Sequence, residues 1–120
     1  MNAKPLRELL THIEDNPALL DVNTYGEARP SGIVADLAGR MLLLNGWTLA
    51  GDDSFLSPDG TREINRPQDI EDEAQALLGL SDDQLWDGGD RDRLFSLPAN
   101  EAVARLRELT EEAETVIANA

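Results

Sequence analysis

Apolar side chains recur at helical spacing near the start of the chain. Within residues 5–14 the spacing is three and four positions, which places these side chains on one face of an α-helix. The apolar positions of this stripe are Leu6, Leu9, Leu10 and Ile13. The helix is expected to end before Pro17, because a residue that precedes proline avoids the helical region. The pattern therefore predicts a first helix over residues 5–14.

Residues 31–46, with the sequence SGIVADLAGRMLLLNG, form the least polar stretch of the chain. Ser31 suits an N-cap and Gly46 suits a helix stop, so we predict a second helix over residues 32–44. Asp36 and Arg40 are four positions apart, the spacing of a pair on one helix face. We expect Asp36 to lie on the solvated side of this helix, paired loosely with Arg40. The alternative is a partly buried, functional carboxylate.

Residues 47–65 have a different pattern. Short apolar pieces are separated by Gly and Asp, and the SPDG sequence at 57–60 is typical of a turn. This pattern predicts a small β-hairpin or meander, with strands around residues 47–49, 54–56 and 61–64.

The second half of the chain returns to helical spacing. A helix over residues 67–79 is expected to stop at Gly79, and the SDDQ sequence at 81–84 has the form of a capping box that begins a short helix. A last helix is predicted over residues 98–117. The predicted core consists of Leu9, Ile13, Leu37, Met41, Leu44, Leu77, Leu78, Leu106 and Leu109. The fold class expected from these elements is mainly α: a compact bundle of about four helices, with a small β-hairpin or meander around residues 47–65, in a single domain over residues 1–120.

Charge excludes several classes of function. The 120 residues include 24 Asp and Glu against 10 Lys and Arg, for a formal net charge of −14. Such a surface repels nucleic acids and anionic membranes, so we expect neither as a direct partner. The chain has no Cys, no apolar run of the roughly 18 residues that a membrane span needs, and no apolar secretory segment near residue 1. We expect a cytoplasmic protein.

The acidic residues concentrate in one segment. Residues 69–92 hold nine of them and a single base, Arg91. Helix starts favour acidic residues, and two helices are predicted to begin near here, which explains part of this density. A protein partner with a basic surface is the functional explanation, and mimicry of a nucleic-acid backbone is the alternative. The predicted partner-binding residues are Asp82, Asp83, Trp86, Asp87, Asp90 and Asp92, with Trp86 as an apolar anchor.

Candidate catalytic chemistry is sparse. His12 is the only histidine, so a His-based triad or a zinc site of several His and Cys ligands is not available. Residues 52–63 have the length of a calcium loop, but Leu56 and Ser57 occupy positions that need a ligand and a glycine. We therefore predict no catalytic residue, no metal ligand and no cofactor. An enzyme that uses only carboxylates stays open, and a deep pocket that joins Asp36 to a second buried acid would favour it.

Several short motifs resemble a group of small proteins from actinobacteria and their phages. The sequence HIEDNPALL resembles the opening "I-x-x-(H/N)-P" of that group, and SGIVADLAGRM resembles its "CGTxxCxAGxA" motif. AQALLGL and the pair Leu94–Phe95 resemble its later "A-x-x-LLGL" and "LF" motifs. Ser31 and Asp36 stand where the group has its two Cys residues, so thiol chemistry by that pair could not operate here. The resemblance implies a compact helical fold and an actinobacterial or phage context, but no reaction.

Charge, composition and resemblance together predict a function. We expect a small, acidic, non-enzymatic accessory protein of phage origin that binds a protein partner through its acidic surface. The alternative is a nucleic-acid mimic that inhibits a host DNA-binding or defence protein, and a carboxylate-only enzyme is the third hypothesis. Neutralising Asp82, Asp83, Asp87 and Asp90 should then spare folding and abolish binding. The sequence leaves the oligomeric state open.

Overall fold

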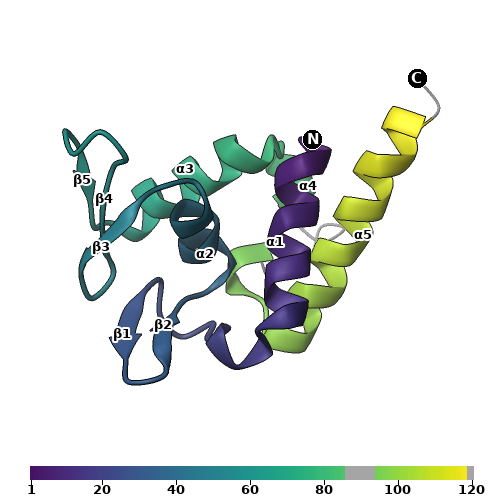
Figure 1. Cartoon of the computed structure of the whole chain (residues 1–120). Helices are drawn as coiled ribbons and strands as arrows, with labels where there is room; N and C mark the ends of the chain where they lie inside the picture. The colour runs from purple at the N-terminus through teal and green to yellow at the C-terminus, as the bar shows by residue number, and fades with distance from the viewer. Residues whose placement is uncertain (86–93, 119–120) are drawn as a thin grey trace.

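Helices and two small β-sheets both contribute to the fold (Figure 1). The computed structural model describes residues 1–85 and 94–118. Its α-helices are α1 (Ala3–Asp15), α2 (Leu37–Leu44), α3 (Pro67–Leu78), α4 (Asp82–Leu85) and α5 (Ala99–Ala118), and its short 3-10 helices are η1 (Pro17–Leu19) and η2 (Leu94–Ser96). One antiparallel sheet pairs β1 (Glu27–Arg29) with β2 (Gly32–Val34). The other has the order β3 (Thr48–Gly51), β4 (Ser54–Leu56), β5 (Glu63–Ile64).

The helices enclose the core, and both sheets lie at one end of the molecule. α1 packs beside α5, while α2 packs against both α1 and α3 (Figure 1). The predicted stripe of α1 is buried along its whole length: Leu6, Leu9, Leu10 and Ile13. Of the predicted core, Leu44 and Leu77 are only partly buried, and the other seven residues are buried. Phe55 of β4 is a fully buried core residue outside the predicted set.

The predicted fold class is wrong. The described residues form five α-helices and two antiparallel sheets, a mixture of α and β structure rather than a mainly-α bundle of four helices. The meander within residues 47–65 is present as β3–β4–β5, but the hairpin β1–β2 was not predicted at all. Ser31 and Gly32 were expected to begin a helix, but Ser31 lies in the turn before β2 and Gly32 is the first residue of that strand.

The first five residues of the predicted helix 32–44 are held extended by other parts of the chain. Gly32, the first residue of β2, has φ +130, and the branched side chains of Ile33 and Val34 suit the rest of this strand. The Ala35 N–H then donates to the Leu19 carbonyl at 3.1 Å, and the Ala35 carbonyl accepts from the Asp21 N–H at 3.0 Å. These bonds replace the ones a helix would supply, so α2 begins only at Leu37.

Boundaries with strong local signatures match the structure. Gly79 ends α3 in the left-handed conformation with φ 66, and the Leu80 N–H donates back to the Gln75 carbonyl. Ser81 and Gln84 form the predicted capping box, with bonds of 2.8 and 3.2 Å. In the part of the chain that the structure describes, no helix combines the length and apolarity that crossing a membrane requires.

Candidate functional site

The predicted partner-binding residues are only partly within the described structure. Asp82 and Asp83 are exposed in the first turn of α4, where the helix dipole favours negative charge. Asp82 accepts a hydrogen bond from the Gln75 side chain at 2.9 Å, which fastens α4 to α3. The other four predicted residues, Trp86, Asp87, Asp90 and Asp92, lie outside the described residues.

The acidic residues of α3 do not all face solvent. Glu71 is buried, whereas Asp69 and Asp72 are exposed. Together with Glu73, these two exposed residues line an open groove of about 540 Å³ between α3 and the strand β5. Arg62 also lines the groove, and its guanidinium pairs with Glu73 at 3.1 Å and lies 5.5 Å from the centre of the Trp47 ring. We call Asp69, Asp72, Glu73, Asp82 and Asp83 the acidic face.

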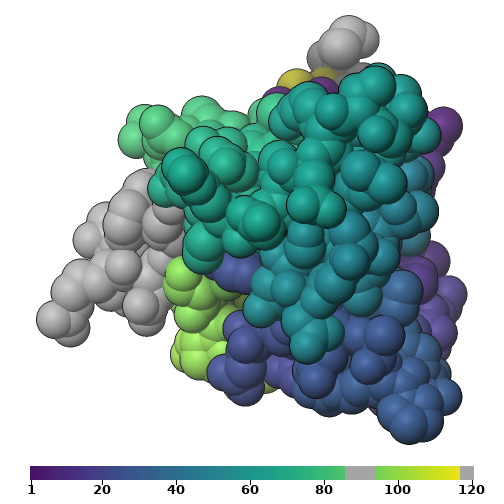
Figure 2. All heavy atoms as spheres, turned by 90° about the vertical axis from the view of Figure 1, so that its left-hand side faces the viewer, coloured from purple at the N-terminus to yellow at the C-terminus, as the bar shows by residue number. Residues whose placement is uncertain are grey.

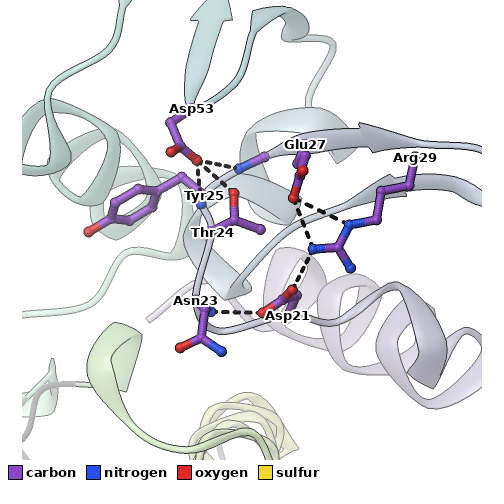
Figure 3. A network of polar contacts seen from close by, with 8 residues as sticks. Asp21, Asn23, Thr24, Tyr25, Glu27, Arg29 and Asp53 are labelled. Carbon is purple, nitrogen blue, oxygen red and sulfur yellow. Dashed lines mark hydrogen bonds and ion pairs between the residues drawn. The ribbon is translucent and has the colours of Figure 1, made fainter.

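A second polar region lies where the loop before β1 meets the β3–β4 turn (Figure 3). The Asp53 Oδ1 atom accepts three hydrogen bonds from this loop: from Thr24 Oγ1 at 2.8 Å, from the Tyr25 N–H at 2.8 Å and from the Gly26 N–H at 3.1 Å. The Asp53 N–H in turn donates to the Gly26 carbonyl at 2.8 Å. One carboxylate oxygen therefore fixes the backbone of residues 24–26.

Asp53 can do this because of its backbone conformation. Its φ is 56, in the left-handed region that Asp and Asn enter more readily than most residues. On the other side of the loop, Arg29 bridges Asp21 and Glu27, at 2.9 Å to each, and Figure 3 shows this ion-pair cluster beside the Asp53 cluster. The loop is thus held by two separate polar clusters.

Asp36 lies on the inner side of the same region. It is the N-cap of α2, and its Oδ1 atom accepts from the Gly39 N–H at 2.8 Å. Only 3% of its surface is exposed, so the expected solvated position is wrong. The expected pairing with Arg40 is also wrong, because Arg40 donates to the Ile33 carbonyl at 2.5 Å and no ion pair joins it to Asp36 among residues 1–85. Because a strand leads into α2, the Asp36 side chain can fold back and cap the first helical turn. Within the predicted continuous helix over residues 32–44, Asp36 could not act as a cap.

Tyr25 connects the loop to α2 and α3. Its hydroxyl donates to a Glu71 carboxylate oxygen at 2.5 Å. Its carbonyl packs directly on Gly39 of α2, where any Cβ would overlap the carbonyl oxygen. Glycine is required at position 39 for this close approach of two backbones.

These groups line a cavity of about 370 Å³. Its polar lining consists of Asn23, Thr24, Tyr25, Asp36, Asp53 and Ser96. Val22 and Phe95 supply the apolar part of the wall. Figure 2 shows this side of the molecule, where the light green surface of the η2 region lies below the teal of α3 and beside the blue of the segments around β1 and β2. Asp36 and the half-buried Asp53 both line the cavity. A deep pocket that joins Asp36 to a second buried acid would favour a carboxylate-only enzyme, and this cavity meets that condition in part.

The surroundings of Asp36 and Tyr25 raise the pKa of both groups. Burial raises the pKa of the Asp36 carboxyl well above its ordinary value of 3.8, and the charges of Glu71 and Asp53 raise it further, while the Gly39 N–H opposes the change. Burial likewise raises the pKa of the Tyr25 hydroxyl, and the hydrogen bond to Glu71 adds to the effect. Tyr25 therefore remains protonated and serves as a hydrogen-bond donor.

This arrangement limits the chemistry that the cavity can perform. Asp36 can donate or accept a proton, but Asp53 Oδ1 and the Tyr25 hydroxyl are already engaged in bonds that hold the loop and α3. His12 does not line the cavity, and burial lowers its pKa. Within residues 1–85 and 94–118, no three His, Asp or Glu side chains are grouped to hold a metal ion. The geometry is that of a cavity with one buried, titratable acid.

Comparisons with family models, with curated proteins and with solved structures find no match to this chain. The resemblance to small actinobacterial and phage proteins therefore stays a prediction.

The burial of Asp36 has a measurable effect on stability. We expect Asp36→Asn to raise the free energy of unfolding at pH 7, because Asn can still cap α2 while it removes a buried acid. The pKa of this carboxyl is higher in the folded protein than in the unfolded chain. Its contribution to the free energy of unfolding is therefore fully present below pH 3.8 and is lost as the pH rises through the folded pKa. The advantage of Asn should therefore vanish near pH 3.5. Urea unfolding of both proteins at both pH values tests this, and an equal difference at the two pH values would show that Asp36 is not buried.

Proposed function

We propose that this chain is a small, non-enzymatic accessory protein that binds a protein partner with a basic surface through its acidic face. The groove beside α3 is the observation that carries the proposal. Three carboxylates line it against one guanidinium, and that guanidinium is already paired with Glu73. Asp82 and Asp83 extend the same charge along α4.

The groove has the chemistry that a long basic side chain requires. Ile64 supplies an apolar wall for the aliphatic stem of a Lys or Arg side chain, while Asp69 and Asp72 accept its charged end. The two acids are exposed, so binding costs little desolvation and association should be fast at low salt. A cytoplasmic location and an actinobacterial or phage origin are parts of the same proposal, and both rest on the sequence.

Neutralising the acidic face tests the proposal. We expect Asp69, Asp72, Asp82 and Asp83, all changed to Asn, to leave the fold intact and to weaken partner binding by at least about tenfold, which corresponds to about 1.4 kcal/mol. Tagged wild-type protein would retain the partner from an extract of its native host, and affinities would then be measured with the purified partner. Raising the salt from about 0.1 M to about 1 M shortens the Debye length from about 10 Å to about 3 Å and should release the partner.

A matched control separates this face from net charge. Changing Asp15, Asp52, Glu111 and Glu112 to their amides removes the same number of exposed charges on other elements. This control should bind as the wild type does. Equal loss in both variants, or no loss in the first, would contradict the proposal. Competition between this chain and duplex DNA for one basic groove of the partner would instead favour nucleic-acid mimicry. The inward position of Glu71 does not favour mimicry, because it interrupts the row of acids.

The cavity at Asp36 supports a second candidate, a carboxylate-only enzyme. Asp36 and Asp53 both line it, and the pKa of Asp36 is raised, as in many general acids. Binding is favoured over catalysis because Asp53 Oδ1 is occupied by three donors of the loop. Turnover that Asp36→Asn abolishes would establish the enzyme.

A further inference from the structure

The cavity at Asp36 has one chemical need that its own lining does not meet. Asp36 is 3% exposed, and its side chain accepts from backbone N–H groups in the first turn of α2, chiefly that of Gly39 at 2.8 Å. No Lys, Arg or His is among the residues that line the cavity in the described part of the chain. A carboxylate buried without a cation is unfavourable, and a positively charged group that enters the cavity would relieve this.

The groups that face Asp36 reinforce the preference for a cation. Asp53 approaches from the β3–β4 turn and Glu71 from α3, and both charges act on Asp36. The hydroxyl of Tyr25, from the loop before β1, donates a hydrogen bond to Glu71 and stays neutral. Arg40 follows on α2, but its guanidinium is bonded to the Ile33 carbonyl. The electrostatic potential inside the cavity is therefore negative.

The remaining lining indicates the size and shape of the occupant. The volume of about 370 Å³ lies at the small end of the range of roughly 300–1,000 Å³ for small-molecule sites. Val22 and the buried ring of Phe95 offer apolar contact, while Asn23 and Ser96 offer further oxygen atoms for N–H donors. An ammonium group on a short apolar stem satisfies both parts of the wall.

We propose that this cavity is a binding site for a small primary amine, whose ammonium group pairs with the Asp36 carboxylate while its carbon chain lies against Val22 and Phe95. The site is independent of the acidic face, since neither Asp69 nor Asp82 lines it. Because an ammonium pairs with the ionised carboxylate, binding releases the Asp36 proton wherever the free protein holds it, and affinity rises with pH until Asp36 is fully ionised.

The test uses n-butylammonium as the probe, with 1-butanol as its neutral counterpart, at constant ionic strength. We expect saturable chemical-shift changes at the backbone amides of Thr24, Gly39 and Ser96 with the amine, and none with the alcohol. Calorimetry in two buffers of different ionisation enthalpy should show net proton release at the acid end of the pH range, where the free protein still holds this proton.

Variants at the cap connect the binding to Asp36. Asp36→Asn and Asp36→Ser both keep an N-cap residue and remove the charge, so each should fold and lose at least tenfold in affinity for the amine. Glu111→Gln, at an exposed position of α5, is the matched control and should bind the amine as the wild type does. Equal binding of the alcohol, shifts confined to α3, or undiminished affinity in folded Asp36→Asn would overturn the proposal. None of these results bears on partner binding by the acidic face.

Discussion

Replacement of Gly39 by Ala should lower the free energy of unfolding by about 3 kcal/mol or more, at the high end of the effects of single substitutions. The added methyl group would overlap the Tyr25 carbonyl oxygen, and this is backbone that cannot turn aside as a side chain could. The loop is fixed there by Asp53, and the Thr24 carbonyl accepts from the Asp36 N–H at 2.9 Å. Urea unfolding monitored by circular dichroism would measure the loss.

The sign of this effect distinguishes two structures for the same residues. In a solvated helix over residues 32–44, Gly→Ala would stabilise by roughly 1 kcal/mol through helix propensity. Gly51→Ala is the control, because a Cβ at position 51 would meet only Ser54, at 4.0 Å. We expect this control to stay within about 1 kcal/mol of the wild type. A more stable Gly39→Ala protein would contradict the packing of α2 on the Tyr25 loop.

Asp53→Ala should destabilise the protein by about 2–4 kcal/mol, since unpaired, partly buried donors cost roughly 1–3 kcal/mol each and some of these can reach water. The substitution removes the acceptor of Thr24 Oγ1 and of the Tyr25 and Gly26 N–H groups. It also places Ala at φ 56, a left-handed conformation that Ala adopts less readily than Asp. The cavity beside Asp36 should lose its shape as the loop is released.

Two further variants divide this loss into its causes. Asp53→Asn keeps an acceptor oxygen and tolerates the left-handed backbone, so it should cost about 1 kcal/mol or less. Asp53→Gly relieves the backbone but removes the acceptor, and it should be intermediate. Equal unfolding free energies for the Ala and Asn variants would show that the three hydrogen bonds do not stabilise the loop.

Local sequence was sufficient to predict an element where that element has both an apolar stripe and a strong boundary residue. The α1 stripe, the Gly79 stop of α3 and the Ser81–Gln84 capping box follow from spacing and from single residue types. These features depend on neighbours within one helical turn. They were therefore predictable without knowledge of the rest of the fold.

The segment before α2 was not predictable in this way. Gly-Ile-Val-Ala-Asp suits a strand or a buried helix equally well by its apolar pattern. The choice is made by bonds from Ala35 to Leu19 and Asp21, which lie 14 to 16 positions earlier in the chain. The Asp36–Arg40 spacing fitted an ion pair, but Asp is also a strong N-cap residue, and that property was the available indication of the strand-to-helix change.

The cavity was missed for a related reason. Its polar groups come from the loop before β1, the start of α2, the β3–β4 turn and η2, and no spacing in the sequence connects them. Asp36 alone attracted attention, as a lone acid in an apolar stretch. On the acidic segment, composition identified the exposed Asp82 and Asp83 but could not show that Glu71 points inward to Tyr25.

The start of α2, the close contact at Gly39 and the cavity all depend on the buried position of Asp36. The most direct measurement is the side-chain carboxyl carbon shift of Asp36, followed by NMR from pH 2 to pH 9. The structure predicts that burial moves the midpoint well above the ordinary value of 3.8, whereas the exposed Asp59, hydrogen-bonded by Ser57 and Thr61, titrates at about 2. An Asp36 midpoint at or below 3.8 would place this carboxylate in solvent and contradict the account.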